Sequence, residues 1–288
     1  MAYEVNIVAD SVGPTGARIT TFQLKYPRMI HSELLTHRMF SRNASSTRAI
    51  PTAKMIEWIE KDPAMPVYWG KNQQGMQATQ ELSEPYASRA TEVWLKARDQ
   101  AVRHAKTLTD IGVHKQIASR ILEPWAHINV VLTATDFNNF FTLRCHPAAM
   151  PEIQVLAVQM ARAYRASKPV HRQSLLGWHI PFVTPDELTD NTLVDCLKFS
   201  VARCARVSYL TFEGKQPDLK ADIRLHDMLA SNGHWSPFEH QAECSADSSR
   251  RSGNFRGWVQ YRERFPEGVF DSFDFATLNQ FGERDFVV

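Results

Sequence analysis

The most informative part of the sequence is Thr36-His37-Arg38-Met39-Phe40-Ser41-Arg42-Asn43-Ala44-Ser45-Ser46-Thr47-Arg48. An apolar helical pattern ends here and gives way to hydroxyl and amide side chains interleaved with arginines. Small hydroxyl residues let backbone N–H groups approach an anion, and arginine binds phosphate oxygens through two parallel hydrogen bonds. We therefore expect an anion-binding loop, although composition alone also allows a plain, solvated basic loop.

A second stretch, Gly233-His234-Trp235-Ser236-Pro237-Phe238-Glu239-His240, holds two histidines and a glutamate. Such a set suggests a metal site, but the spacing that places two histidines on one helix face is absent, and Pro237 interrupts the segment. We expect a loop in which His234 faces a ligand, and no metal.

The middle of the chain carries polar residues at predicted helix ends, namely Arg120, Asn139, Arg144 and Glu152. Each arginine alone could be a surface charge, because the helix dipole favours cations at C-termini. Cys145-His146 could form a nucleophile and base, yet adjacent residues rarely point at each other. No G-x-G-x-x-G or Walker loop occurs, so a nucleotide would be bound by another device.

Composition is that of an ordinary globular protein. The 288 residues include 33 Lys+Arg and 31 Asp+Glu, and 43% are hydrophobic. This excludes a disordered chain, a collagen-like repeat and a protein that coats nucleic acid through bulk charge. No apolar run is long enough to cross a bilayer, no secretory signal is visible, and the four cysteines form no C-x-x-C pair. We expect a soluble, cytoplasmic protein.

Helices dominate the predicted elements. Two short strands are expected within residues 3–25, a helix from Pro27 to about Phe40, and a loop from Pro51 to about Gln80. Further helices are expected over 83–108, 114–122, 137–143, from 151, 192–207 and 218–231. The stretch 167–185, with Pro169, Gly177, Pro181 and Pro185, is the best candidate for a linker.

Together these segments resemble the flavin-dependent thymidylate synthases, the ThyX family. The family signature is an Arg-His-Arg triplet, a serine three residues on and a Ser-x-Arg, which Thr36-His37-Arg38, Ser41 and Ser46-Thr47-Arg48 match in spacing. Its second segment is similar to Arg120–Leu122, Asn139–Arg144 and Glu152-Ile153. Its third is similar to Ala205-Arg206-Val207-Ser208 and Gly233–His240. Each motif is weak alone, but three at family-like spacing are specific.

The motif order is unusual. The segment similar to Gly233–His240, which we call the Gly-His segment, comes first in the family and last in this chain. The resemblance therefore implies a circularly permuted α+β fold, with helices packed on a small, mainly antiparallel sheet. We expect one catalytic domain over 1–288, with a nucleotide and flavin segment at 1–166, a linker or permutation seam at 167–185, and the Gly-His segment within 186–288. Permutation is tolerated where termini lie at the surface.

The resemblance also implies an activity. Family members convert dUMP to dTMP with FAD, using methylene-tetrahydrofolate and NADPH, at sites between the subunits of a homotetramer. Carried over by position, the nucleotide phosphate would contact Ser46, Arg48 and Arg120. Arg144 would lie at the pyrimidine and stabilise charge on the ring. The flavin would contact His37, Arg38, Ser41 and Asn139, while His234 and Ser236 would line its folate side. Arg144 and His234 are the predicted catalytic residues.

Departures from the family pattern leave alternatives open. Thr36 replaces the first arginine, Glu33 stands where glutamine is usual, and Thr133 and Thr135 replace residues that help to bind FAD. Because a carboxylate can accept from a cytosine amino group, Glu33 makes dCMP a competitor of dUMP, and hydroxymethylation a competitor of methylation. The other rivals are a Cys145 nucleophile and a nucleic-acid-binding module built on Arg28–Arg48, whose affinity would fall steeply with salt.

Overall fold

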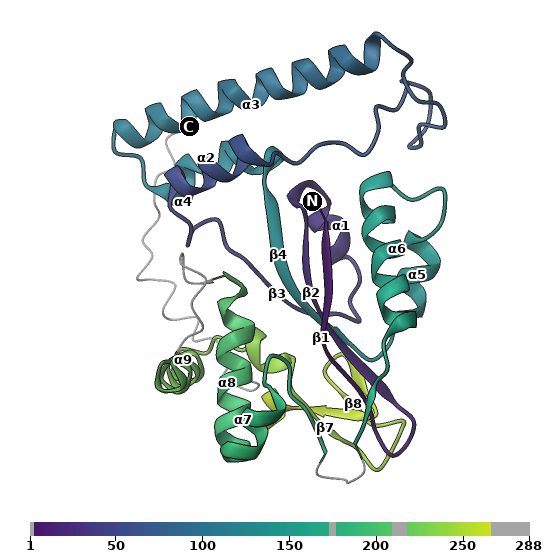
Figure 1. Ribbon diagram of the computed structural model, residues 1–288, viewed down its shortest axis with the longest axis vertical. Helices are drawn as coiled ribbons and strands as arrows, with labels where there is room; N and C mark the ends of the chain where they lie inside the picture. Colours follow the sequence, from purple (N-terminus) through teal and green to yellow (C-terminus); the bar gives the residue numbers. More distant parts are fainter. Residues whose placement is uncertain (1–2, 173–176, 209–217, 266–288) are drawn as a thin grey trace, which may run out of the picture.

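The computed structural model describes residues 3–172, 177–208 and 218–265. Its centre is a five-stranded sheet in the order β3-β4-β2-β1-β5 (Figure 1). The strands are β1 (Glu4–Val12), β2 (Arg18–Pro27), β3 (Ser41–Ala44), β4 (His127–Ala134) and β5 (Val170–His171). All neighbours are antiparallel except β1 and β5. The α+β architecture expected from the sequence is therefore confirmed.

One face of this sheet carries the main hydrophobic core. Alternate residues of β2 and β4, including Phe22, Leu24, Val130 and Leu132, are buried there because successive side chains of a strand point to opposite faces. The helices that cover this face are α1 (His31–Leu35), α5 (Asn138–Arg144) and α6 (Pro151–Ala166). Figure 1 shows α5 and α6 side by side next to the sheet.

The other face is polar at one end and apolar at the other, where Ile19 of β2 and Val131 of β4 are fully buried. Lys25 of β2 and His127 and Asn129 of β4 point to it by the same alternation. At one end of this face lie α2 (Thr52–Lys61), α3 (Tyr86–Asp110), α4 (Lys115–Ala118) and the 3-10 helix η2 (Arg120–Trp125). A second hydrophobic cluster, which includes Met55 and Val102, joins α2 to α3.

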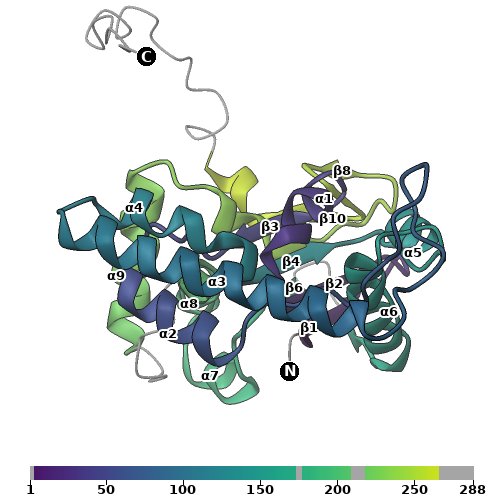
Figure 2. The same cartoon turned by 90° about the horizontal axis from the view of Figure 1, so that it is seen from above.

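The C-terminal part packs against the apolar end of the same face, on Ile19 and Val131. It contains a three-stranded sheet in the order β10-β7-β6, with β6 (Trp178–His179), β7 (Ala242–Cys244) and β10 (Trp258–Gln260). A small hairpin joins β8 (Arg251–Ser252) and β9 (Phe255–Arg256). The helices are α7 (Pro185–Asp190), α8 (Leu193–Ala205) and α9 (Leu219–Ser231), seen together with α3 and α6 in Figure 2.

A chain of buried hydrogen bonds, which we call the inter-sheet joint, connects the two sheets. Ser11 Oγ lies 3.0 Å from His179 Nδ1, His179 Nε2 lies 2.8 Å from Thr21 Oγ1, and Thr21 Oγ1 lies 2.7 Å from Thr133 Oγ1. His240 Nδ1 completes the chain at 2.8 Å from Thr133 Oγ1. All five side chains are fully buried. Burial lowers the pKa of His179 and of His240 to about 3, so both rings are neutral.

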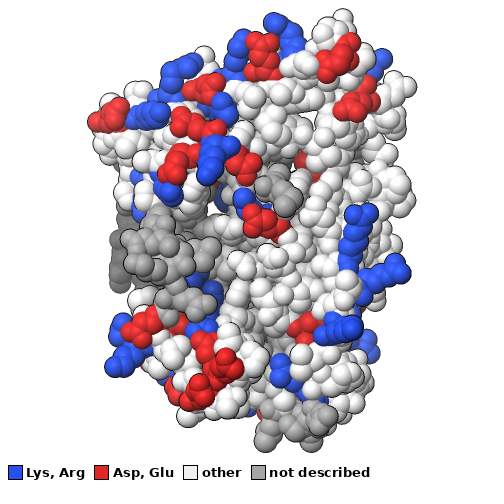
Figure 3. Space-filling model, viewed as in Figure 1, with Lys and Arg blue, Asp and Glu red and all other residues white. Residues whose placement is uncertain are grey.

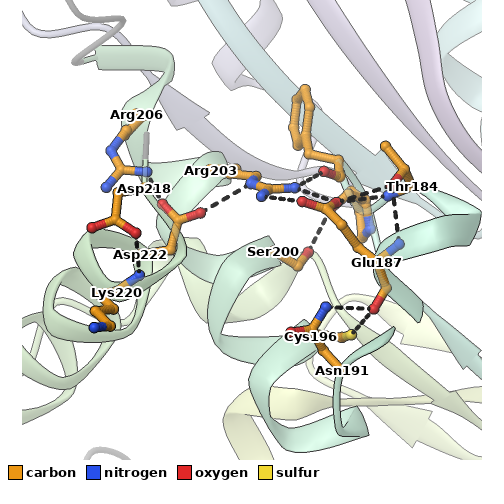
Figure 4. A network of polar contacts seen from close by, with 12 residues as sticks. Thr184, Glu187, Asn191, Cys196, Ser200, Arg203, Arg206, Asp218, Lys220 and Asp222 are labelled. Atoms are coloured by element: carbon orange, nitrogen blue, oxygen red, sulfur yellow. Dashed lines mark hydrogen bonds and ion pairs between the residues drawn. The ribbon is translucent and has the colours of Figure 1, made fainter. Parts of the chain in front are cut away.

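An ion-pair network ties α7, α8 and α9 together (Figure 4). Arg203 of α8 binds both oxygens of Glu187, at 2.6 and 2.7 Å, and its Nε donates to Asp222 of α9 at 3.1 Å. Arg206, from the Ala-Arg-Val-Ser segment, binds the other oxygen of Asp222. The hydrogen bonds from Arg203 lower the pKa of Glu187 to about 2. Arg206 therefore has a structural partner in this fold.

Several sequence-based predictions of secondary structure were wrong. The helix expected to reach Phe40 ends at Leu35, because residues 41–44 pair with β4 instead. The loop expected over 51–80 contains α2, whose apolar residues Met55, Ile56 and Ile59 pack on α3. Strand β4 was not predicted. The long helices α3, α6, α8 and α9 are confirmed within a few residues.

The proposed linker at 167–185 contains β5, which pairs with β1, and β6, which pairs with β7. Its residues 173–176 lie outside the described residues, as do 209–217 and 266–288 of the predicted C-terminal segment. Within the described ranges, no helix is both long enough and apolar enough to cross a membrane.

Candidate nucleotide site

Three residues singled out by the sequence meet beside the main core. Arg144, the last residue of α5, forms an ion pair with Glu33 of α1, and its Nε donates to His37 Nε2 at 3.0 Å. The His37 ring packs edge-on against Phe140, with centroids 4.9 Å apart. Burial, followed by the charges of Arg144 and Arg42, lowers the pKa of His37. His37 is therefore a neutral acceptor that orients the Arg144 guanidinium.

The guanidinium of Arg144 remains accessible to a ligand. Its side chain is 20% exposed and that of Glu33 is 26% exposed. With Nη1 on Glu33 and Nε on His37, the Nη2 edge makes no hydrogen bond within the described part of the chain. Arg144 is thus fixed from one side and can present a cation to a flat ring from the other.

The predicted phosphate loop follows β3. The Ser45 N–H donates to the Asn129 carbonyl at 2.8 Å, and the Asn129 N–H donates to Ser45 Oγ at 3.1 Å, which fixes the start of the loop against β4. The Arg48 side chain is exposed. Among the residues that the structure describes, neither the Ser46 hydroxyl nor the Arg48 guanidinium has a side-chain partner. Both are therefore open to an anion.

Arg120 lies next to this loop because both contact Glu123. Glu123 Oε1 accepts from Arg120 Nη1 at 2.9 Å and from Thr47 Oγ1 at 3.1 Å, and Arg28 Nη2 lies 3.2 Å away. Glu123 is not among the site residues predicted from the sequence. A signal was available: Glu123 separates Leu122 from Pro124, where the family-like segment has Leu-Pro. The Glu123 carboxylate thus lies between Arg120, Arg28 and the Thr47 hydroxyl. This is the position that a bound anion would take.

The residues predicted to contact the flavin divide into two groups, one enclosed and one exposed. His37 is 7% exposed and already accepts from Arg144 Nε. Ser41 is 1% exposed and accepts from Gln260 Nε2 at 3.1 Å, so its hydroxyl is already engaged inside the protein. Arg38, Asn139 and His234 are exposed, and none of their side chains has a partner in the described ranges.

The Gly-His segment nevertheless contacts the Thr36–Arg48 stretch. Ser236 Oγ donates to Asn43 Oδ1 at 3.3 Å across 193 residues of sequence, and Asn43 Nδ2 donates to the Cys204 carbonyl at 2.7 Å. The fold therefore brings together the two ends of the motif set, which the sequence alone could not place in contact.

The changed positions Thr133 and Thr135 are closed to a ligand. Thr133 is fully buried in the inter-sheet joint, and Thr135 Oγ1 accepts from the Arg256 N–H at 3.0 Å. Of the predicted flavin contacts, Arg38, Asn139 and His234 keep exposed hydrogen-bonding groups that suit a flavin, whereas Ser41 and the changed position Thr133 are enclosed in the protein.

The described residues give less support to a metal site or a cysteine nucleophile. In the described residues, no group of three or more His, Cys, Asp or Glu side chains could hold a metal ion. Burial raises the pKa of Cys145, whose side chain packs on the main core. A protonated thiol is a poor nucleophile, which argues against the Cys145 alternative.

Comparison with known proteins gives one family match. The family model Thy1, "Thymidylate synthase complementing protein", matches residues 17–170. No curated protein matches the chain. A solved structure of the UMP/dUMP methylase PolB from Streptomyces cacaoi with 5-Br dUMP is 16% identical, with a TM-score of 0.47, and covers 56% of this chain and 89% of that chain. The PolB complex with 5-Br UMP is 18% identical, with a TM-score of 0.44, over 56% and 88%.

The family match spans more than half of the sequence and includes both the Thr36–Arg48 stretch and the Arg120–Glu152 segment. The chain therefore belongs to the Thy1 family, the flavin-dependent thymidylate synthases.

Proposed function

We propose that this enzyme methylates C5 of a pyrimidine deoxynucleoside monophosphate, with dUMP to dTMP as the leading reaction. The observation that carries the proposal is the fixed Arg144 guanidinium, bound by Glu33 and His37 and still accessible. Such a cation would stabilise negative charge that develops on the ring as C5 becomes nucleophilic. The chemistry then needs no enzyme nucleophile.

The phosphate would bind at the loop after β3. Ser46 and Arg48 are open to an anion. Arg120 would release the Glu123 carboxylate and bind the same phosphate instead. When bound, FAD would supply the hydride, with NADPH as its reductant and methylene-tetrahydrofolate as the one-carbon donor. Arg38, Asn139 and His234 would hold the flavin, and Ser236 would lie on its folate side.

The second candidate is a dCMP methylase or hydroxymethylase on the same scaffold. Glu33 favours it, because a carboxylate beside the base can accept from the amino group of cytosine but not from the carbonyl of uracil. The pairing of Glu33 with Arg144 leaves the other carboxylate oxygen for such a bond.

A nucleic-acid-binding module has less support. On the face drawn in Figure 3, Lys and Arg are interspersed with Asp and Glu over the α2 and α3 region. This mixed pattern agrees with the formal net charge of +2 and differs from a continuous basic stripe.

The deciding experiment is an absorbance spectrum of the purified protein, followed by FAD titrations with dUMP or dCMP present. Flavin bands, or FAD binding strengthened by one nucleotide, would support the proposal and identify the substrate. Absence of flavin under every condition would contradict it and point to a flavin-free one-carbon transfer.

We also infer that the chain is a circular permutation that works as a homotetramer. The family match ends at residue 170, at the start of the proposed seam at 167–185, while the Gly-His segment follows it. Light scattering of the protein in solution tests the tetramer, and a monomer with full activity would contradict it.

A further inference from the structure

Gln260, the last residue of β10, joins segments that are far apart in the sequence. Its side-chain amide donates to Ser41 Oγ of β3 at 3.1 Å and lies 3.5 Å from the carbonyl oxygen of Glu239, which ends the 3-10 helix η4 (Ser236–Glu239). Both Gln260 and Ser41 are buried, and Figure 2 shows β10 next to β3. One enclosed amide therefore connects the Thr36–Arg48 stretch to the Gly-His segment.

The β8–β9 hairpin is shaped around this amide. Gly253, between the two strands, has a φ of 53°, and a Cβ at this position would lie 2.3 Å from Gln260 Oε1. Ser252 Oγ accepts from the Gln260 N–H at 2.8 Å. The hairpin therefore fixes Gln260, and only glycine at position 253 combines this backbone conformation with room for the amide.

Arg262 binds the same segment through its charge. It belongs to the 3-10 helix η5 (Tyr261–Arg264) and forms an ion pair with the Glu239 carboxylate. Glu239 is thus bound at its carbonyl oxygen by Gln260 and at its carboxylate by Arg262. The other contact between this segment and β3, from Ser236 to Asn43, is exposed and 3.3 Å long. We call Gln260 and Arg262 the segment clamp.

Strand β3 lies between the clamp and the Arg144 side of the molecule. Ser41 and Asn43 face the C-terminal part, whereas Arg42 points the other way, where its Nη1 donates to the Leu35 carbonyl of α1 at 2.7 Å. His37 and its bond to Arg144 follow directly after α1. The place of the Gly-His segment relative to Arg144 is therefore set through β3.

We propose that Gln260 and Arg262 are positioning residues, which hold His234 and Ser236 where the reaction needs them relative to the Arg144 guanidinium. The inference rests on the proposed function, because it assigns His234 and Ser236 to the flavin and folate side of the site. In this arrangement Ser41 anchors the clamp and does not contact the flavin itself.

Gln260→Leu in the full-length protein tests the clamp, because it removes both hydrogen bonds of the amide and nearly keeps the side-chain volume. We expect kcat to fall by about 10–100-fold, since small displacements of reacting groups are costly. The Kd for FAD should rise, whereas the Kd for dUMP should stay as in the wild type, because Ser46 and Arg48 lie on the loop after β3. Loss of folding would instead weaken both ligands alike.

Ser41→Ala should have an effect similar to that of Gln260→Leu and should add little to it, because two partners of one hydrogen bond act as a unit. Gly253→Ala should also lower kcat by displacing the Gln260 amide. Its matched control is Gly16→Ala, at a φ of 81° with no atom within 4 Å of the new Cβ, which introduces backbone strain without that contact.

Arg262 is tested by charge rescue. Arg262→Met should lower kcat, and Arg262→Lys should restore most of the loss, because an ammonium can still pair with Glu239. The control is Arg264→Met in the same short helix, which loses a pair with Glu243 at 2.6 Å and should leave kcat unchanged.

Hydrogen exchange of residues 233–240 gives a readout that needs neither cofactor nor activity. Exchange there should be faster in Gln260→Leu, with α6 unchanged. Unchanged exchange, or faster exchange with wild-type kcat and FAD affinity, would overturn the proposal while the proposed function stands. A wild-type protein that neither binds FAD nor methylates a nucleotide would contradict the proposed function itself, and with it the catalytic role of the clamp.

Discussion

At the scale of single residues, Arg144 is the side chain whose replacement is most informative. If it stabilises charge that exists only in the transition state, Arg144→Ala should lower kcat by roughly 10²–10³-fold while the Kd for the nucleotide changes only a few-fold. Steady-state kinetics with direct binding measurements separates these effects. The exposed Arg165→Ala is the control. Equal losses of turnover and affinity would demote Arg144 to a simple binding residue.

Replacement of Glu123, beside the predicted phosphate loop, should strengthen nucleotide binding. Its carboxylate neutralises Arg120 and Arg28 and would repel a phosphate. Glu123→Gln keeps the shape and removes the charge, so it should tighten dUMP binding several-fold, roughly 1 kcal/mol. Deoxyuridine, which lacks the phosphate, should bind unchanged, and Glu81→Gln is the matched exposed control. Tighter binding of both ligands would exclude an electrostatic cause.

At the scale of elements, Asp222 joins α8 and α9. Its carboxylate is fully buried between Arg203 and Arg206, so Asp222→Asn removes the counter-charge that Arg206 has in the described part of the chain and leaves Arg203 with Glu187 alone. We expect the free energy of unfolding to fall by about 3–5 kcal/mol in urea denaturation. Asp227→Asn on the same helix removes an exposed carboxylate paired with Lys198 and should cost less than about 1 kcal/mol. Similar losses in the two variants would refute a buried network.

The inter-sheet joint predicts a pH dependence of stability. The pKa of His179 and of His240 falls from 6.5 to about 3 on folding, so the unfolded chain binds more protons than the folded chain in acid. Stability is therefore full above about pH 6.5 and is lost as pH falls toward 3. Between pH 7 and 5.5 each histidine should cost about 1 kcal/mol of unfolding free energy.

Urea denaturation at several pH values measures this effect. His179→Gln removes one of the two histidines of the joint and should flatten the acid slope in part, because burial also lowers the pKa of His31, to about 4. The exposed His104→Gln should leave the slope as in the wild type. A wild-type slope in His179→Gln would show that the joint does not govern acid stability.

At the scale of the whole molecule, permutation itself is testable. A chain opened between 172 and 177, with the present termini joined, would place the Gly-His segment before the Thr36–Arg48 stretch, as in the family. We expect this variant to fold with a melting temperature within a few degrees of the wild type, by calorimetry. An insoluble or molten product would count against a seam at this place.

The sequence by itself determined the family and the long helices, and it predicted the residues of an anion-binding loop. These depend on local information, since helical periodicity and motif spacing are properties of contiguous residues. Tertiary structure alone decided that Ser41–Ala44 and His127–Ala134 pair as strands, that Thr52–Lys61 is a helix, and that Glu123 sits between two arginines. It also decided that Ser41 is enclosed by Gln260, 219 residues away. The physical reason is that strand pairing and burial depend on partners distant in sequence, and no local pattern specifies which partner a polar side chain will meet.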